Sequence, residues 1–134
     1  MNPIELCTKA QTELFGQGRV ELLEELTTPD VVDHGAPPPN QGGRDGLRRT
    51  IQWIHSGLDD VRYEVHDAFA NGDRVAIRCT MHGTHAREWM GTPPSGRSFA
   101  AEHIHIYRLD GDRIAEHWGA RDDLEMLRQV GMLR

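Results

Sequence analysis

The sequence predicts a single α+β domain in which helices come first and an antiparallel sheet follows. Up to about residue 58 apolar residues recur at helical spacing, and from residue 61 they alternate with a period of two. The 134 residues suffice for one hydrophobic core. We therefore expect one domain over residues 1–134, with its helices packed on one face of the sheet.

Three helical segments precede the sheet. Asn2, Pro3 and Glu5 form the N-cap, first-turn proline and capping-box acid of the first, which should end near Gly16 or Gly18. A short second helix is expected over residues 19–27. Residues 33–46 are too rich in proline and glycine for a regular element and predict a loop. A third, amphipathic helix follows, with an apolar stripe made of Leu47, Ile51, Ile54 and Leu58.

Four strands and a last helix complete the chain. Residues 61–70, 73–87, 98–109 and 113–120 alternate and are rich in β-branched and aromatic residues. Turn signals separate them at Asn71-Gly72, Pro93 to Gly96 and Asp110-Gly111, which predicts an antiparallel meander. Helical spacing returns after residue 121, with Asp122 or Asp123 as cap and Gly131 as stop.

Composition narrows the possible partners and the compartment. The net charge of −6 argues against a nucleic-acid partner, which requires a basic surface. No apolar stretch approaches the roughly 18 residues of a membrane span, and the N-terminus lacks the basic and apolar regions of a signal peptide. We expect a cytoplasmic protein with no membrane partner. Cys7 and Cys79 lie in apolar-periodic segments without CxxC spacing and are expected to be buried free thiols.

Two segments carry a resemblance to a known family. Residues 31–49 hold an Asp-His pair, a loop and a Gly-Arg-x-Gly-Leu helix start; residues 105–131 hold Tyr-Arg, a tight turn, Ile-x-Glu-His-Trp and Leu-Arg-Gln-x-Gly. In this order the motifs resemble the SnoaL-like polyketide cyclases, or ester cyclases, over nearly the whole chain. The resemblance implies the cone of the nuclear transport factor two-like superfamily, in which N-terminal helices pack on the concave face of a strongly bent sheet around an apolar pocket. Metal and organic cofactors are usually absent from these cyclases, so we expect none.

Three of the eight histidines are the main candidates for a site. His103 and His105 lie two apart on one predicted strand and face the same way, together with Tyr107. A three-residue loop of Asp110, Gly111 and Asp112 would set His105 opposite His117, whereas a two-residue loop would set it opposite Glu116. We favour the first register, which agrees with the turn of the resembled family. If Ile104 and Ile106 instead face the core, the histidines point to solvent or to a subunit interface.

Imidazole suits acid–base chemistry because its pKa lies near neutrality. We therefore expect His105 and His117 to act as the catalytic pair, with His103 and Tyr107 contacting substrate. Zinc or iron held by His103, His105 and His117 is an alternative, although the acid at the expected spacing, Asp110, belongs to the turn.

Other candidates each have a structural alternative. His34 resembles the loop histidine of the family, which reaches over the pocket mouth, and is otherwise a surface residue. Asp122 is either a catalytic acid or the cap of the last helix. The resembled cyclases place an aspartate just after the His-Trp pair, where this chain has Gly119, and Asp122 would have to replace it. No role is expected for His55, His66, His82 and His85, which are expected at edges or on the surface. Core or pocket-wall positions are expected for Phe15, Ile51, Trp53, Trp89 and Trp118.

Together these features favour a cofactor-free enzyme that closes a ring in, or isomerises, a small hydrophobic or aromatic carbonyl compound by proton transfer, in the manner of an isomerase or lyase. A protein of the same fold that binds such a compound without catalysis is the alternative, and Gly119 supports it. Ala100, Ile104 and Ile106 would form an apolar outer face, so we expect a homodimer or larger homo-oligomer.

Overall fold

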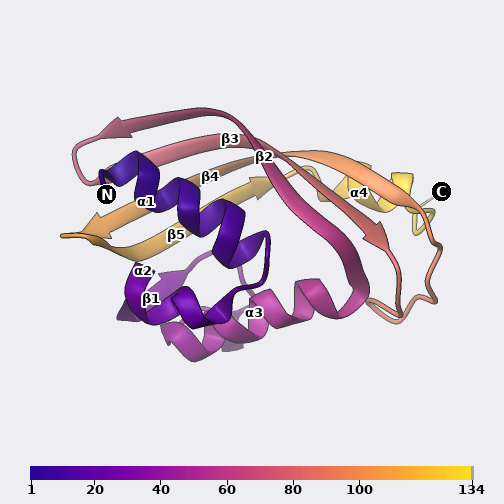
Figure 1. Ribbon diagram of the computed structural model, residues 1–134. Coiled ribbons are helices and arrows are strands. Elements are labelled where there is room, and N and C mark those ends of the chain that lie inside the picture. The colour runs from indigo at the N-terminus through magenta and orange to yellow at the C-terminus, as the bar shows by residue number, and fades with distance from the viewer. Residues whose placement is uncertain (134) are drawn as a thin grey trace.

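The computed structural model describes residues 1–133 and consists of a strongly curved five-stranded sheet with helices on its concave side (Figure 1). The sheet order is β1-β5-β4-β3-β2. In chain order the elements are α1 (Pro3–Lys9), the π-helix η1 (Ala10–Phe15), the 3₁₀ helix η2 (Val20–Leu22), α2 (Leu23–Leu26), β1 (Thr27–Asp33), the 3₁₀ helix η3 (Pro38–Asn40), α3 (Gly43–Gly57), β2 (Leu58–Asn71), β3 (Arg74–His85), β4 (Ser98–Asp110), β5 (Arg113–Arg121) and α4 (Asp123–Gln129). The predicted α+β class and cone are confirmed.

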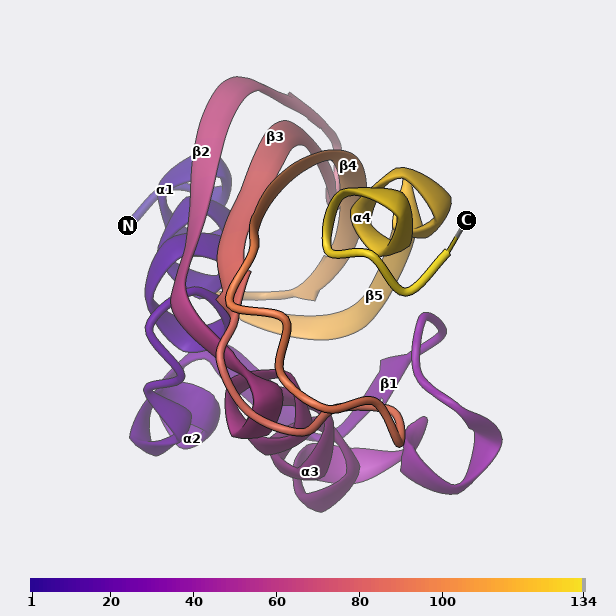
Figure 2. The same cartoon turned by 90° about the vertical axis from the view of Figure 1, so that its right-hand side faces the viewer.

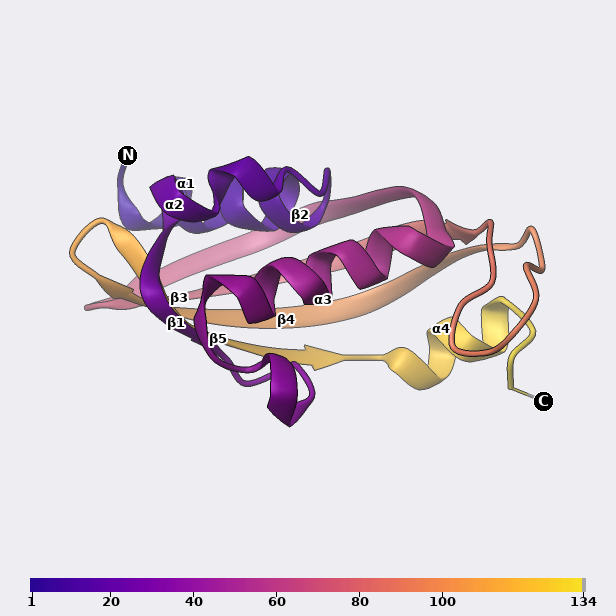
Figure 3. The same cartoon turned by 90° about the horizontal axis from the view of Figure 1, so that it is seen from below.

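The four predicted strands form the expected antiparallel meander from β2 to β5. Two register shifts in β2, between Asp59 and Arg62 and between Val65 and Asp67, bend that strand. Seen end-on, the strands wrap around the interior (Figure 2). From below, α3 runs along the sheet with α1 and α2 beside it, while α4 lies beyond the end of β5 (Figure 3). The helices and the bent sheet therefore enclose one core.

The sequence did not predict β1, which pairs in parallel with β5 at the edge of the sheet. Pro29 lies within β1, and the pairing shifts between Thr27 and Val32, so the strand lacks the regular alternation of a central strand. Parallel pairing sets Asp33 beside His117. The edge strand thus brings the Asp-His loop to the sheet.

The helix caps were predicted well. The Asn2 side chain accepts a hydrogen bond from the Glu5 backbone N–H at 2.8 Å, and that helix continues through η1 to Phe15. α3 buries Leu47 and Ile51 but ends at Gly57, and Leu58 starts β2 rather than closing the helix. Gly57 lies against Trp89, whose side chain would be 2.3 Å from an added Cβ.

The predicted register of the last hairpin is wrong. Asp110 pairs with Arg113 across a Gly111-Asp112 turn, and a bulge then shifts the pairing, so that Tyr107 lies opposite His117 and His105 opposite Gly119. The true register differs from the favoured one by two residues. Because side chains alternate with a period of two, the histidines still share one face.

Candidate functional site

The inner face of β4 carries a row of buried polar side chains. His103, His105 and Tyr107 alternate along the strand with the exposed Ile104 and Ile106. The histidines therefore point into the cone, and the alternative in which the isoleucines face the core is wrong.

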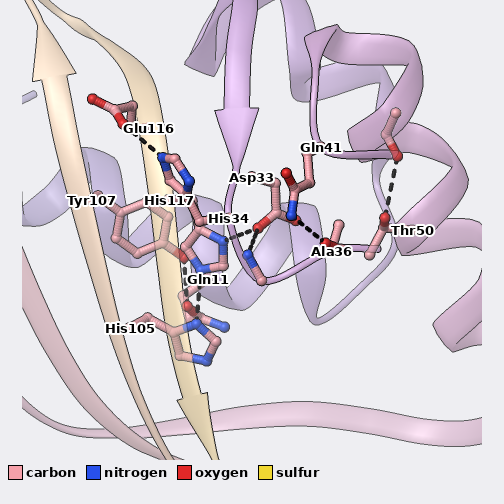
Figure 4. Close-up of polar contacts among 12 residues, drawn as sticks. Gln11, Asp33, His34, Ala36, Gln41, Thr50, His105, Tyr107, Glu116 and His117 are labelled. Carbon is pink, nitrogen blue, oxygen red and sulfur yellow. Dashed lines mark hydrogen bonds and ion pairs between the residues drawn. The ribbon is translucent and has the colours of Figure 1, made fainter. Parts of the chain in front are cut away.

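Three imidazole rings and one carboxylate form a continuous hydrogen-bonded chain, and Figure 4 shows its part from Asp33 through His117 to His105. His103 Nδ1 lies 3.1 Å from His105 Nε2, and His105 Nδ1 lies 2.8 Å from His117 Nε2. His117 Nδ1 in turn lies 2.9 Å from Asp33 Oδ1. All four side chains are buried. We call these residues, Asp33, His117, His105 and His103, the histidine relay.

Asp33 anchors the relay, although the sequence marked it only as part of the Asp-His pair of the family resemblance and not as a site residue. It stands at the end of β1, directly before the loop, and also accepts a hydrogen bond from the Gly35 backbone N–H at 3.0 Å. Burial alone would raise the pKa of Asp33, but the hydrogen bond and charge of His117, the Gly35 N–H and the nearby Arg121 together lower it. Asp33 is therefore a carboxylate.

The carboxylate fixes the direction of every hydrogen bond in the neutral relay. A carboxylate only accepts, so His117 Nδ1–H donates to Asp33, which leaves His117 Nε2 as an acceptor. His105 then donates from Nδ1 to His117, and His103 donates from Nδ1 to His105. His103 Nε2 is left as the free lone pair at the far end. Both nitrogens of His105 and of His117 are occupied within the relay.

The two rings farthest from Asp33 are held neutral. Burial, followed by the charge of Arg121, lowers the pKa of His103 to about 4. Burial also lowers the pKa of His105 well below its usual range, and His117, His103 and Arg121 add to this effect. At neutral pH His103 therefore offers an unprotonated nitrogen.

Gly119 gives the His105 ring its space. It lies opposite His105, and an added Cβ would be 3.3 Å from His105 Nδ1 and 3.4 Å from its Cε1. A larger side chain would press on the ring that joins His103 to His117. The His105 ring thus lies over Gly119, the position where the resembled cyclases place an aspartate.

Arg121 is the cation next to the free end of the relay. It pairs with His103 across β4 and β5, so the two residues lie side by side in the sheet. Its Nη1 lies 3.6 Å from the position that a Cβ on Gly35 would take, and Asp33 Oδ1 lies 3.4 Å from that position. Its side chain is 38 % exposed, with Asp123 Oδ2 at 3.4 Å. The sequence predicted that the last strand ends at residue 120, so Arg121 was not expected in the sheet.

The side chains of His34 and Trp118 point away from the relay, although the His34 backbone N–H donates to the His117 carbonyl oxygen at 2.9 Å. His34 Nε2 contacts Glu116 Oε2 at 2.7 Å, and its ring stacks on Trp118 with centroids 4.9 Å apart. Arg74 covers the Trp118 ring, 5.0 Å from its centroid. Glu116 and Trp118 flank the inward-facing His117 on β5 and so point to the outer face. The expectation that Trp118 lines the core is therefore wrong, and the His34 side chain is not brought to the ring nitrogens of the relay.

Asp122 caps the last helix, as one of its two interpretations predicted. Its Oδ1 accepts a hydrogen bond from the Glu125 backbone N–H at 3.1 Å. It is exposed and stands outside the hydrogen-bonded relay. This geometry assigns Asp122 to the start of α4.

The predicted wall residues divide into two groups. Phe15 and Ile51 are in the core, and the Phe15 ring lies 5.2 Å from that of His117. Trp89 is also buried, but it packs on Trp53 at the far end of α3, and Trp53 is 47 % exposed. Trp53 is therefore neither core nor pocket wall, because it lies on the open side of its helix.

Two buried polar residues were also missed. Gln11 of η1 accepts a hydrogen bond from the Tyr107 hydroxyl at 2.5 Å. His85, expected at the surface, is completely buried at the end of β3, where its Nδ1 accepts from the Ser95 backbone N–H at 3.4 Å. Strand alternation continued to the end of β3 would have found His85, whereas Gln11 interrupts an apolar helix face and has no such signal.

The relay nitrogens face one another in a line instead of converging on a point. Within residues 1–133 no group of three or more histidine, cysteine, aspartate or glutamate side chains is arranged to hold a metal ion. An open groove of about 420 Å³ runs past the end of β5 and is lined by Arg78, Glu102, His103, Ile104, Ala120, Arg121 and Asp122. None of the helices described is long and apolar enough to cross a membrane.

The protein is a curved α+β cone with a buried row of hydrogen-bonded histidines inside it. The family model of SnoaL-like polyketide cyclases matches residues 5–130, and the chain belongs to this family. The predicted family is thereby confirmed.

Sequence relatives and solved structures agree with this assignment. The chain is 26 % identical over 131 residues to DnrD, an aklanonic acid methyl ester cyclase of Streptomyces peucetius, covering 92 % of this chain and 87 % of DnrD. It is 25 % identical to the nogalonic acid methyl ester cyclase of Streptomyces nogalater, covering 87 % and 89 % of the two chains. The structure of IdmH, a proposed polyketide cyclase from Streptomyces antibioticus, matches with a TM-score of 0.84 and 34 % identity, covering 98 % of this chain and 99 % of IdmH.

Proposed function

We propose that this protein catalyses ring closure in a small hydrophobic carbonyl compound by cofactor-free proton transfer through the histidine relay. The observation that carries the proposal is the relay itself, which is anchored by a carboxylate at one end and carries a single unoccupied ring nitrogen at the other. A row of hydrogen bonds that all donate toward Asp33 can accept a proton at His103 Nε2 and later return it.

The relay can move positive charge toward Asp33 without moving any ring. When His103 Nε2 takes a proton from the carbon next to a carbonyl, His103 Nδ1 passes its proton to His105 Nε2. His105 Nδ1 then passes its proton to His117 Nε2. The positive charge comes to rest on His117, beside the Asp33 carboxylate, where opposite charge stabilises it most.

Ring closure then uses the same proton in reverse. The enolate carbon attacks a second carbonyl, a carbon–carbon bond forms, and the new alkoxide takes back the proton from His103. Each transfer along the relay reverses, so the enzyme ends in its starting state. One relay thus serves as general base and general acid.

Arg121 is placed to stabilise the enolate oxygen. It is the cross-strand neighbour of His103, and its guanidinium is partly exposed. A fixed cation at the position where negative charge develops lowers the barrier of such a step. We assign Arg121 this electrostatic role and His103 the transfer of the proton.

Substrate has to open the site before it reaches the base, because His103 is 2 % exposed. The groove at the end of β5 includes His103 and Arg121 in its lining, and its volume of about 420 Å³ falls in the range of ligand pockets. We propose that substrate enters at this end of the sheet. The enclosed pocket expected from the family would form on binding.

The names of the relatives suggest the substrate class, and a direct assay tests it. We propose a carbonyl-rich methyl ester similar to those of aklanonic and nogalonic acid. The wild-type protein should convert one of these esters to a cyclised product, detected by liquid chromatography and mass spectrometry. The variants His103→Gln, His105→Gln and His117→Gln each retain a donor and an acceptor but cannot relay a proton, so each should lose on the order of 10²-fold in turnover.

Two results would contradict this function. Tight binding of an ester without any turnover would favour the non-catalytic binding protein, and equal turnover by the wild type and His103→Gln would remove the relay from the chemistry. Gln52→Met, on the exposed side of α3, is the control and should retain wild-type turnover.

We further propose a homodimer or larger homo-oligomer that works in the cytoplasm. Ile104 and Ile106 are 49 % and 38 % exposed on the outer face, which supports an interface there. Cys7 and Cys79 are buried free thiols, and free thiols suit a reducing compartment. Burial raises the pKa of each thiol to about 12, so both stay protonated. Cell fractionation tests the location, and recovery in the membrane or secreted fraction would contradict it.

A further inference from the structure

The side-chain amide of Gln11 is buried and only half satisfied. Its Oε1 accepts the hydrogen bond from the Tyr107 hydroxyl, but its Nε2 has no hydrogen-bond partner among the residues that the structure describes. The residue is completely buried. An unpaired buried donor destabilises the folded state, so such a group calls for a physical explanation.

The position of this amide links it to the histidine relay. Tyr107, its partner, lies directly opposite His117 in the sheet, with ring centroids 4.8 Å apart. In Figure 4 the Gln11 side chain lies at the Tyr107 hydroxyl, in the same part of the interior as His105 and His117. The unpaired N–H group is therefore within the interior of the cone, one side chain away from the relay.

The local backbone is also unusual. Gln11 starts a wide helical turn, in which its carbonyl accepts a hydrogen bond from the Gly16 N–H at 3.1 Å, five residues on. An added Cβ on Gly16 would be 2.3 Å from the Thr12 carbonyl oxygen, so only glycine closes this turn. Wide turns of this kind occur often at functional sites. Here the turn presents Gln11 to the interior.

We propose that Gln11 Nε2 binds a carbonyl oxygen of the ligand and selects ligands that carry an oxygen at this depth. Tyr107 orients the amide, since its hydroxyl donates to Oε1 and leaves the NH₂ group for the ligand. Burial raises the pKa of Tyr107 well above its usual range, so its hydroxyl keeps the proton that it donates. Gln11 is a specificity-determining residue and takes no proton itself.

This inference deepens the proposed function by stating what the ligand must carry. A planar carbonyl compound pairs with the unsatisfied donor, whereas the same ring system without the oxygen leaves it unpaired. A site built to donate to a ligand oxygen rejects the analogue that lacks it. The preference should appear in binding alone, without turnover.

Two soluble ring systems isolate the contribution of the carbonyl group. Anthraquinone-2-sulfonate and anthracene-2-sulfonate share the planar rings and the charge and differ in the two ring oxygens. Dissociation constants for both are measured by calorimetric titration with the wild type, Gln11→Met and the control Gln52→Met. The wild type and the control should prefer the quinone by tenfold or more, and Gln11→Met should lose that preference while binding anthracene-2-sulfonate unchanged.

Several outcomes of this titration would overturn the proposed role of Gln11. A wild type that does not prefer the quinone, including one that binds neither compound, overturns the proposal, and so does a Gln11→Met variant that retains the preference. If Gln11→Met does not fold, as judged by circular dichroism, then Gln11→Asn, which withdraws the amide by one methylene, should show the same loss. Loss of ester turnover in the wild type with an intact quinone preference would refute the proposed function alone.

Discussion

His105 has no free ring nitrogen, because it donates to His117 and accepts from His103. In the mechanism that we propose, one member of the relay, His103, therefore meets substrate and the other members move charge. His105 and His117 are interior members of the relay, and their replacement tests proton conduction instead of substrate contact.

Neutral buried histidines make stability depend on pH. The folded state holds the pKa of His103 at about 4, whereas its pKa in the unfolded chain is about 6.5. Between these values the unfolded state binds more protons, so stability is retained above about pH 6.5 and falls as the pH drops toward 4. The loss from His103 is on the order of 3 kcal/mol.

Urea unfolding between pH 7 and 4 measures this slope. His103→Gln removes one titrating group and should flatten the curve over the same range. An identical slope in the wild type and the variant would mean that His103 is not held neutral in the folded protein.

Gly119 offers a second test at this scale. A methyl group there would force the His105 ring to move by a few tenths of an ångström, and the 2.8 Å bond to His117 leaves little room. Gly119→Ala should fold and lose at least about tenfold in turnover, because proton transfer requires close geometry. Gly42→Ala, with no atom within 4 Å of the added Cβ and an ordinary φ of −104°, is the control. Full activity in Gly119→Ala would contradict the role of the His105 ring in proton transfer.

Sequence reasoning at the residue scale succeeded where strand alternation decides orientation. The inward direction of His103, His105 and His117 follows from a period of two and survived an error of two residues in register. Asp33 and Gln11 could not be found in this way. Their roles depend on a parallel edge strand and on a helix packed across the sheet, which are both long-range contacts.

At the element scale, β1 and the bulge after Arg108 determine which residues meet. Neither has a local signature, since β1 contains Pro29 and the bulge follows from the pairing of two strands. The helices were easier to place, because caps and apolar stripes are local features. The start of α4 is an example.

The cap of α4 gives a prediction at this scale. Asp122→Asn keeps an oxygen that accepts the Glu125 N–H, so stability and turnover should stay close to those of the wild type. Asp122→Ala loses the cap and should cost about 1 kcal/mol in the free energy of unfolding. Denaturant unfolding and the ester assay measure both. An inactive but stable Asp122→Asn variant would make Asp122 the catalytic acid in place of the relay.

At the scale of the whole molecule, the sheet has an inner face that holds the relay and an outer face that is exposed. Ile104 and Ile106 point outward because His103 and His105 point inward. We expect the outer face to be buried between copies of this chain. Light scattering at micromolar concentration should give at least twice the mass of 15.1 kDa. Ile104→Glu together with Ile106→Glu should give a folded monomer, and a monomeric wild type would contradict the expectation.

The direction of the relay can be observed directly by nitrogen-15 NMR of histidine-labelled protein at neutral pH. We predict that His103, His105 and His117 all carry their proton on Nδ1, with Nε2 unprotonated. Single His→Gln variants assign each NMR signal to its residue. Asp33→Asn, which no longer forces its partner to donate, should weaken this tautomer in all three rings together. A proton on His103 Nε2 in the wild type, or three rings that titrate independently near pH 6.5, would contradict the account.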